Sequence, residues 1–318
     1  MHQGSHDPWL VLLSIFVAIF AATMALRTAQ TASSTQSPFY KGIAVLTGAF
    51  ALGSGVWSMH FIGMLALKIP SEMSISTGMT LLSFVPVCVA AWLAFHLLTR
   101  HAISFGQLVA GGMVVGLGVG AMHYLGMLSI QSTLEIRHDP MLFAAAVLLA
   151  ITLAPATFWL WFRLQQGSWQ RAWVNLIAGC AMGLSIAIVH YVGMAGVVFL
   201  GEPGLSQIGV SLSEIHLALI LSCISITLTI MVVALNSLIR SYELNQQIRE
   251  GSSRLQATLD TAVDGIITID SKGLIRDFNR SAERLFGWQK EEVIGRNVKM
   301  LMPEPYQSAH DGYLNNYM

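Results

Sequence analysis

Seven long apolar runs, none containing Asp, Glu, Lys or Arg, constrain the fold of this 318-residue chain more than any other feature. A transmembrane helix needs roughly 20 consecutive apolar residues. The runs cover residues 9–26, 42–67, 78–99, 105–130, 141–161, 172–200 and 215–239. We therefore expect seven membrane-spanning helices joined by short loops, with the lipid bilayer as their surroundings.

Composition changes near residue 240. The whole chain is only 11% charged, against about 25% in soluble domains, and most of its charged residues follow residue 240. We expect a membrane domain at 1–240, a linker helix at 241–254 and a soluble segment at 255–318. The net charge of zero provides no basic surface for nucleic acid, so we expect no nucleic-acid partner.

One motif occurs three times within the apolar runs. Each copy reads His, aromatic, apolar, Gly, Met, and the copies start at His60, His123 and His190, which are 63 and 67 residues apart. A glycine precedes each histidine by seven residues, at Gly53, Gly116 and Gly183. This repetition indicates one unit used three times. The expected fold class is an all-α membrane protein built from three helical hairpins plus one helix.

Basic residues between the runs indicate the orientation of the helices. Six lie on one side of the expected membrane and two on the other; the six are Arg27, Lys41, Arg100, Arg163, Arg171 and Arg240. Cytoplasmic loops are enriched in Lys and Arg, so we expect the N-terminus outside the cell and the C-terminus in the cytoplasm. The three histidines then share one depth, roughly 12–15 Å below the outer boundary.

Imidazole and thioether groups on one helix face suggest a metal site. Histidine is the commonest metal ligand, and thioether sulfur favours copper, especially Cu(I). Residues four apart share a helix face, so each motif can offer one nitrogen and one sulfur ligand. The candidate metal ligands are His60, Met64, His123, Met127, His190 and Met194, with Met59 and Met122 as additional sulfurs.

The repeated motif resembles the Met-His-Tyr-Thr signature of the MHYT family of bacterial membrane sensor domains. Phe61 replaces the first Tyr, Val189 replaces the third Met, and Ile62, Leu125 and Val192 replace Thr. The resemblance implies seven helices with motifs in the second, fourth and sixth. It also implies copper binding and sensing of a diatomic gas (O2, CO or NO) or of redox state.

Two alternatives to copper fit the same motif. The histidines could hydrogen-bond across helices with the methionines as core filler, or His and Met could hold haem. A metal-handling or transport protein without a signalling role is the alternative function.

The soluble segment follows a different pattern. Gly265–Asp270 and Leu274–Phe278 read as two strands joined by a hairpin turn, and Asn279 can cap a helix at 280–286. These segments and Glu292-Val293-Ile294-Gly295 resemble the start of a PAS domain, an α+β fold. Because a whole domain needs roughly a hundred residues, we expect only the N-terminal part of a PAS domain here.

Two further features concern the soluble segment. Its residues 302–313 resemble the oxygen-sensing haem-PAS kinases, which implies His310 as a haem ligand; PAS domains without haem also carry the motif. Leu244, Ile248, Leu255 and Leu259 are spaced as on an amphipathic helix, although Gly251-Ser252-Ser253 can interrupt it. This helix could form a coiled coil in a homodimer or pack on the next domain.

Together these features and resemblances predict a multi-pass signalling sensor of a bacterial inner membrane, with a periplasmic N-terminus and a cytoplasmic C-terminus. We expect it to pass a signal through the seventh helix to the PAS segment. We expect no catalytic domain in this chain. The resemblances imply that such chains end in a cyclic-di-GMP diguanylate cyclase or phosphodiesterase, or in a histidine kinase.

Overall fold

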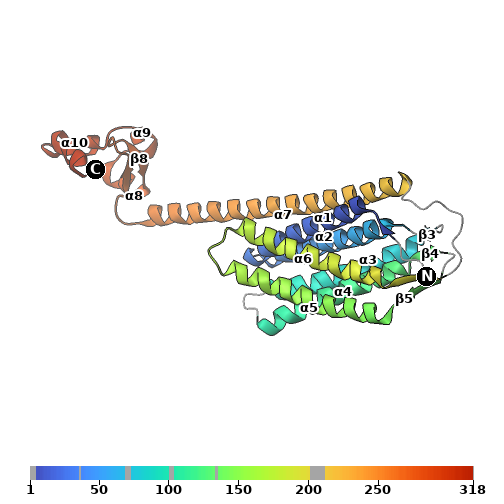
Figure 1. Ribbon diagram of the computed structural model, residues 1–318. Helices are drawn as coiled ribbons and strands as arrows, with labels where there is room; N and C mark the ends of the chain where they lie inside the picture. The colour runs from blue at the N-terminus through green and yellow to red at the C-terminus, as the bar shows by residue number, and fades with distance from the viewer. Residues whose placement is uncertain are drawn as a thin grey trace. The chain divides into compact units, whose positions relative to one another are not determined.

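The computed structural model of the chain describes residues 5–35, 37–68, 73–99, 104–132, 135–200 and 212–317. Figure 1 shows a bundle of long helices, followed along the chain by a smaller segment of short helices and strands. The chain divides into two compact units, Met1–Arg240 and Ser241–Met318. The last long helix belongs to both units.

Seven helices in the described residues are long and apolar enough to cross a membrane, which confirms the expected number. They are α1 Pro8–Ser34, α2 Pro38–Leu65, α3 Thr77–Leu98, α4 Phe105–Met127, α5 Pro140–Gln165, α6 Arg171–Ala195 and α7 Leu212–Thr261. The expectation that Gly251-Ser252-Ser253 can interrupt the last helix is wrong, because α7 passes through them without a break. A single helical glycine costs only about 1 kcal/mol relative to alanine, too little to end a 50-residue helix.

Among the residues that the structure describes, three short antiparallel ribbons lie at the helix ends nearest the three histidines, and the apolar runs did not predict them. The pairs are β1 Ser5–His6 with β2 Leu67–Lys68, β3 Met73–Ile75 with β4 Ile130–Ser132, and β5 Glu135–His138 with β6 Val197–Leu200. Each ribbon joins the start of a hairpin's first helix to the end of its second. Helices α2, α4 and α6 therefore end before the apolar runs do, because the last residues pair with a strand.

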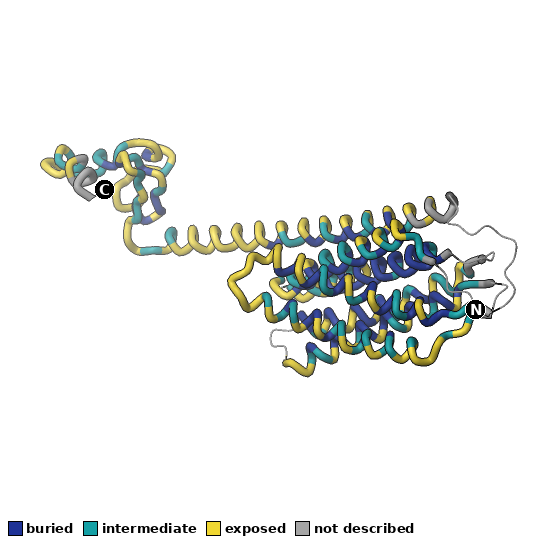
Figure 2. Tube along the Cα trace, viewed as in Figure 1, coloured by how far each residue is buried: buried dark blue, intermediate teal, exposed yellow. Residues whose placement is uncertain are grey.

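The first six helices form a closed ring. Each packs on its two neighbours along the chain, and α1 packs on α6 to close the ring. The motif helices α2, α4 and α6 also contact one another, so they face the centre. Figure 2 shows the buried residues gathered inside this bundle. On α7, the Asn236 side chain donates a hydrogen bond of 3.0 Å to the Thr47 hydroxyl of α2.

Glycines bring the three hairpins together. At each glycine seven residues before a motif histidine, an added Cβ would collide with the first helix of the next hairpin. The contacts are Gly53 with Cys88, Gly116 with Ala150 and Gly183 with Ile19. Small residues let helix backbones approach closely in lipid, where tight packing replaces the hydrophobic drive. The repeated glycine thus makes the same contact three times around the ring.

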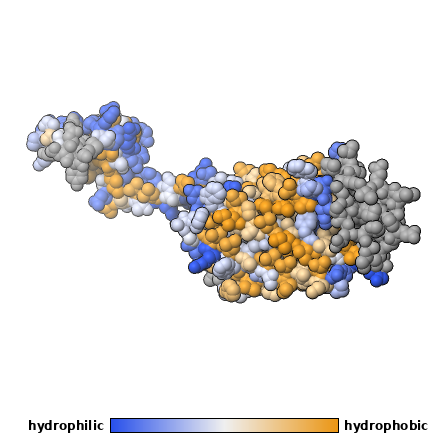
Figure 3. All heavy atoms as spheres, viewed as in Figure 1, coloured by the Kyte–Doolittle hydropathy of each residue, from blue (hydrophilic) through white to orange (hydrophobic). Residues whose placement is uncertain are grey.

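Large apolar side chains cover the outside of the bundle. Figure 3 shows this hydrophobic surface over much of the visible face. Its exposed members include Phe16, Phe50, Leu81, Leu93, Leu117, Leu148, Trp159 and Leu184. An apolar surface of this extent is unusual for a soluble protein. It fits helices that face lipid.

The second unit, Ser241–Met318, corresponds to the expected soluble segment and is called the soluble unit below. Beyond the end of α7 it contains a two-stranded sheet and short helices. These are β7 Ile267–Ile269, β8 Ile275–Phe278, α8 Arg280–Phe286, α9 Lys290–Val293, the 3-10 helix η1 Val298–Leu301 and α10 Tyr306–Tyr317. The hairpin between the strands turns at Gly273, whose φ of 77° suits glycine. Ile275, Phe278, Ala282, Val293 and Val298 form its apolar core. The two strands and the Asn279 cap agree with the sequence pattern.

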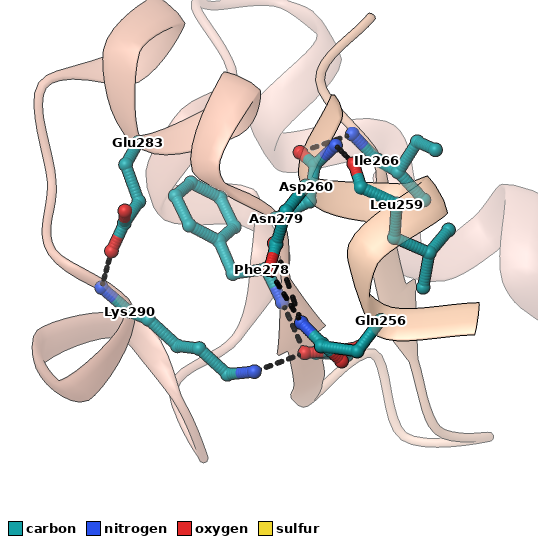
Figure 4. A network of polar contacts seen from close by, with 9 residues as sticks. Gln256, Leu259, Asp260, Ile266, Phe278, Asn279, Glu283 and Lys290 are labelled. Atoms are coloured by element: carbon teal, nitrogen blue, oxygen red, sulfur yellow. Dashed lines mark hydrogen bonds and ion pairs between the residues drawn. The ribbon is translucent and has the colours of Figure 1, made fainter. Parts of the chain in front are cut away.

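Asn279 connects α7 to this core. Its side-chain oxygen accepts hydrogen bonds from the Ile266 and Ala282 amides, at 2.8 and 2.9 Å. Its side-chain nitrogen donates to the carbonyls of Leu259 and Asp264, at 2.7 and 3.1 Å. Figure 4 shows the end of the Asn279 side chain next to Leu259 and Ile266, with a hydrogen bond to each. Because Leu259 lies in α7, one buried amide holds the end of the long helix against this apolar core.

Candidate metal centre

His60, His123 and His190 meet where α2, α4 and α6 contact one another. Their Nδ1 atoms form a triangle in which each of the three separations is 3.2 Å. The three residues are 0%, 2% and 1% exposed. Each ring lies nearly perpendicular to the other two, at 82°, 85° and 90°. We call these residues the histidine triangle.

A motif glycine supports each imidazole of the histidine triangle. A Cβ added to any of these glycines would collide with the Nε2 side of the ring on a neighbouring helix. The pairs are Gly63 with His190, Gly126 with His60 and Gly193 with His123. Going around the triangle, each glycine contacts the histidine of the motif helix on the same side: α2 contacts α6, α6 contacts α4, and α4 contacts α2. The Gly of one motif therefore positions the His of another, which explains why both occur in each repeat.

Hydrogen bonding cannot satisfy the histidine triangle. A neutral imidazole nitrogen either carries a proton and donates, or carries a lone pair and accepts, but it cannot do both. Among three Nδ1 atoms, at least two must be in the same state. At least one of the 3.2 Å contacts therefore brings together two donors or two acceptors. The Nε2 atoms are also buried without a hydrogen-bond partner.

A metal ion fits this donor set. With metal–imidazole bonds of about 2.0 Å, tetrahedral coordination separates two nitrogens by about 3.3 Å, close to the 3.2 Å found here. One ligand atom from each of the three buried histidines can meet at a single ion. All three lone pairs would then point at one cation, which removes the conflict between like hydrogen-bonding states.

The predicted sulfur ligands lie in two groups. Met64, Met127 and Met194 are buried in one apolar cluster, one helical turn beyond the histidine triangle toward the ribbons. We call these three residues the methionine layer. Met59 and Met122 instead belong to the large core of the bundle. The methionine layer is the group that the i and i+4 spacing places on the same helix faces as the histidines.

The opposite side of the histidine triangle is apolar. Val56, Val119 and Ile186 lie one turn before the histidines and are 0%, 3% and 5% exposed. A small cavity of about 20 Å³ opens between α4, α5 and α6 and is lined partly by Val119 and Ile186. This volume accommodates one very small molecule. The triangle thus has sulfur on one side and aliphatic groups with a small cavity on the other.

Two histidines in the ribbons, His6 and His138, lie next to the site, and the sequence did not predict them as part of it. We call these two residues the second level of histidines. His6 packs edge-on against Tyr191, with ring centroids 5.7 Å apart, and His138 packs against Tyr124 at 5.5 Å. These tyrosines in turn pack on His190 and His123. The Nε2 atoms of His6 and His138 are buried without a partner. Burial lowers the pKa of both imidazoles, which favours their neutral, metal-binding form.

A repeated tripeptide could have revealed this second level. His6-Asp7-Pro8 and His138-Asp139-Pro140 have the same sequence, and both aspartates cap the helix that follows. In the remaining hairpin, Ile75 precedes the capping position, and Phe61 stands where the other motifs have Tyr. A strand histidine therefore occurs in two hairpins, and each contacts a motif tyrosine.

The predicted haem ligand His310 lies in α10 of the soluble unit. Its Nδ1 atom is buried without a hydrogen-bond partner, and α10 packs on η1. His310 and the histidine triangle belong to different units of the chain, so they are separate candidate sites. The haem role stays a prediction.

Comparison with known proteins identifies both units. A family model described as the MHYT bacterial signalling protein N-terminal repeat matches residues 53–111 and 116–174, and a PAS fold model matches 253–317. The chain carries MHYT repeats followed by a PAS domain. Both MHYT matches begin at the glycine seven residues before the motif histidine. The third motif, around His190, lies outside the matched segments but supplies the third corner of the triangle.

Named relatives are signalling proteins. The chain is 35% identical over 200 residues to the bifunctional diguanylate cyclase/cyclic di-GMP phosphodiesterase MucR of Pseudomonas aeruginosa, covering 62% of this chain and 28% of that protein. It is 26% identical over 289 residues to the signaling protein YkoW of Bacillus subtilis, covering 88% and 35%. Over 70 residues it is 47% identical to the sensor protein FixL of Bradyrhizobium diazoefficiens, covering 22% and 14%.

The chain spans about a third or less of the length of these relatives. Its seven apolar helices and MHYT repeats indicate a multi-pass membrane protein.

Proposed function

We propose that this chain is the sensing part of a bacterial inner-membrane signalling protein, in which the histidine triangle holds a copper ion. The observation that carries the proposal is the set of three buried Nδ1 atoms, 3.2 Å apart, whose hydrogen-bonding states cannot all be compatible. The methionine layer beside it favours Cu(I) over harder cations such as Mg²⁺.

The three motif helices supply the sensing geometry. A bound cuprous ion would provide a centre whose ligand number and charge change with oxidation or with binding of a diatomic gas. Each histidine comes from a different helix, and a glycine of another helix holds each ring. Any change in the spacing of the histidines must therefore shift α2, α4 and α6 relative to one another.

The cavity beside the triangle supports a small apolar ligand. It lies between α4, α5 and α6 and includes Val119 and Ile186 in its lining. Diatomic gases such as O2, CO and NO are small enough for this volume. We propose that the gas enters from the lipid and reaches the histidine triangle through this cavity.

Helix α7 is the proposed route of the signal. It contacts α2 through the Asn236–Thr47 hydrogen bond, and Asn279 holds its far end at the PAS core. We propose a periplasmic N-terminus, a cytoplasmic PAS domain and an output that makes or hydrolyses cyclic di-GMP, as the name of the MucR relative states for that protein. A histidine kinase is the other output that the PAS resemblance implies.

Metal analysis of the detergent-purified chain tests the proposal. We expect about one copper ion per chain in the wild type and loss of that ion when all three histidines of the triangle are replaced by alanine. His96→Ala, at an exposed position near the other end of the bundle, is the control and should keep the metal. A wild-type chain that binds no copper from a Cu(I) source would remove the basis of the proposal.

The alternative function is metal handling or transport. Copper uptake into proteoliposomes containing this chain would support that function instead. The PAS domain and the continuous α7 favour signalling, because a transporter has no evident use for either.

His310 is a second and separate candidate. Its unpartnered Nδ1 and the 47% identity with the sensor protein FixL support haem binding in the PAS unit. An absorption spectrum of the chain after haem addition tests this: a Soret band that disappears in His310→Ala is expected, and its absence in the wild type would contradict it.

A further inference from the structure

A large open cavity with mixed polar and apolar walls lies at the end of the bundle remote from the histidine triangle. It has a volume of about 770 Å³ and is bounded by parts of α1, α6 and α7. Each of these helices contributes one arginine to its lining: Arg27 from α1, Arg171 from α6 and Arg240 from α7. The cavity has no part in the metal centre, and in the sequence these arginines indicated only the orientation of the helices.

The charges in this cavity are unusual. Basic residues are common at cytoplasmic helix ends, but there they are usually spread over the surface. Here one arginine from each of three helices lines the same open cavity, and the described residues that line it include no acid. Arg27 and Arg171 are exposed and accessible to a ligand. Guanidinium groups bind carboxylate and phosphate oxygens with strong, often paired hydrogen bonds.

The start of α6 adds to the positive potential. This 25-residue helix begins at Arg171, and its N-cap Gln170 makes no side-chain capping bond. Arg171 and Ala172 of its first turn both line the cavity. Backbone amides at a helix N-terminus and the helix dipole favour a bound anion. The helix start and the arginines Arg27 and Arg171 favour the same type of ligand.

The remaining walls combine polar and apolar groups. The Asn175 amide donates to Gln30 at 2.9 Å and accepts from the Trp161 indole at 3.0 Å, which connects α1, α5 and α6 into a fixed polar wall. Met24 and Leu176 supply apolar lining on the same cavity. An amphiphile with an anionic head and an apolar tail matches both kinds of wall.

We propose that this cavity binds a phosphate-bearing anion through Arg27, Arg171 and the N-terminus of α6, with Arg240 in the α7 wall of the cavity. A phospholipid headgroup and a soluble phosphate share this chemistry, and the apolar lining favours the lipid. Arg240 is the last residue of the membrane unit. A bound anion would therefore lie beside α1, α6 and α7 at the point where α7 leaves the bundle.

Native mass spectrometry of the whole chain with bound lipid tests the proposal. The chain is exchanged into mixed micelles containing phosphatidylglycerol or phosphatidylcholine, or into lipid-free detergent with inorganic phosphate. We expect retained phosphatidylglycerol in the wild type and about tenfold weaker retention in the double variant Arg27→Gln/Arg171→Gln, because charge-assisted hydrogen bonds are lost. Arg163→Gln, which removes a charge from α5 outside this lining, is the matched control.

The outcomes separate the two sources of phosphate. Retention of phosphatidylglycerol that the double variant loses supports a lipid site. A melting temperature that rises with inorganic phosphate in the wild type, but not in the double variant, supports a soluble ligand. Equal retention in the wild type and the double variant, or an equal loss in Arg163→Gln, would overturn the proposal. Unchanged melting of the variants without anion shows that they fold.

Discussion

At the scale of single residues, the motif glycine decides how closely the histidines approach. Gly126 lies against the imidazole of His60, and no side chain larger than hydrogen fits between them. Glycine is therefore needed at this position for the packing of the ring and not for its backbone flexibility. The same holds for Gly63 and Gly193, whose added Cβ atoms would meet His190 and His123.

Gly126→Ala should displace His60 and weaken copper binding. Overpacking of a tight core costs about 1–3 kcal/mol, so we expect a lower melting temperature and a loss of copper affinity of about tenfold or more. Competition with a Cu(I) chelator measures the affinity. Gly120→Ala in the same helix is the control: nothing lies within 4 Å of its added Cβ, so copper binding should be unchanged. Equal effects of the two substitutions would contradict this role of Gly126.

The second level of histidines should affect how fast the metal enters. His6 and His138 contact the tyrosines that pack on the histidine triangle, but they are not corners of it. We expect the double variant His6→Asn/His138→Asn to bind as much copper as the wild type at equilibrium and to load it at least several-fold more slowly. Stopped-flow transfer from a Cu(I) chelate measures the rate. His216→Asn, exposed on α7, should load at the wild-type rate.

Asp277 should make the soluble unit sensitive to acid. The hydrogen bond from the Lys290 ammonium lowers the pKa of the Asp277 carboxyl below its ordinary value. A lowered folded-state pKa stabilises the fold above the unfolded pKa of about 3.9, and this stabilisation is lost as pH falls through the folded pKa. The urea midpoint of the soluble unit should therefore fall between pH 6 and pH 3, and less so in Asp277→Asn. Identical slopes in both proteins would exclude this pair as a cause.

At the scale of elements, Asn279 is the connection between α7 and the PAS core. It is 3% exposed and uses its side-chain oxygen and nitrogen in four hydrogen bonds. Its two acceptor contacts involve backbone amides, and its two donor contacts involve carbonyls. Only an amide side chain can make all four, because a carboxylate has no proton to donate.

Asn279→Ala should destabilise the soluble unit by about 2–3 kcal/mol, since buried backbone groups would lose their partners. Asn279→Asp should cost at least as much, because its charge would face the Leu259 and Asp264 carbonyls. Hydrogen exchange of the last turns of α7 and of β8 is the measurement, and both should exchange faster together. If exchange rose only in β8, the proposed connection between α7 and the core would be absent.

At the scale of the whole molecule, a row of exposed apolar side chains along one side of α7, which we call the exposed stripe, predicts association of two chains. Leu244, Ile248 and Leu255 are 42%, 67% and 61% exposed, although they are large and apolar. A second copy of the helix would cover them in a short coiled coil. The continuity of α7 through Gly251 makes this stripe available along the whole linker.

Replacing Leu244, Ile248 and Leu255 by glutamate should shift the chain from dimer to monomer, because charges would face each other in the seam. Sedimentation in detergent measures the state. Gln247→Glu and Ser252→Glu, also exposed on this helix, control for added charge and should leave the dimer intact. A wild-type chain that sediments as a monomer would refute the prediction.

Much of the architecture could be predicted from the sequence because its causes are local. Uncharged apolar runs require membrane helices, and the helical period places His60 and Met64 on one face. The repeat also indicated that three hairpins share one design, and the turn and cap residues around Gly273 and Asn279 indicated the PAS strands. Composition alone does not reveal the ribbons, because their short strands exist only through pairing with residues far away in the chain.

The tertiary structure alone decided how these parts meet. Sequence spacing cannot give the rotation of one helix against another, so it could not show that three Nδ1 atoms form a triangle or that Gly126 holds His60. The distribution of basic residues placed Arg27, Arg171 and Arg240 on one side of the membrane, but not in one cavity. That these three residues line the same cavity depends on the ring order of the helices. Distances between distant residues depend on packing, and packing is a property of the folded chain.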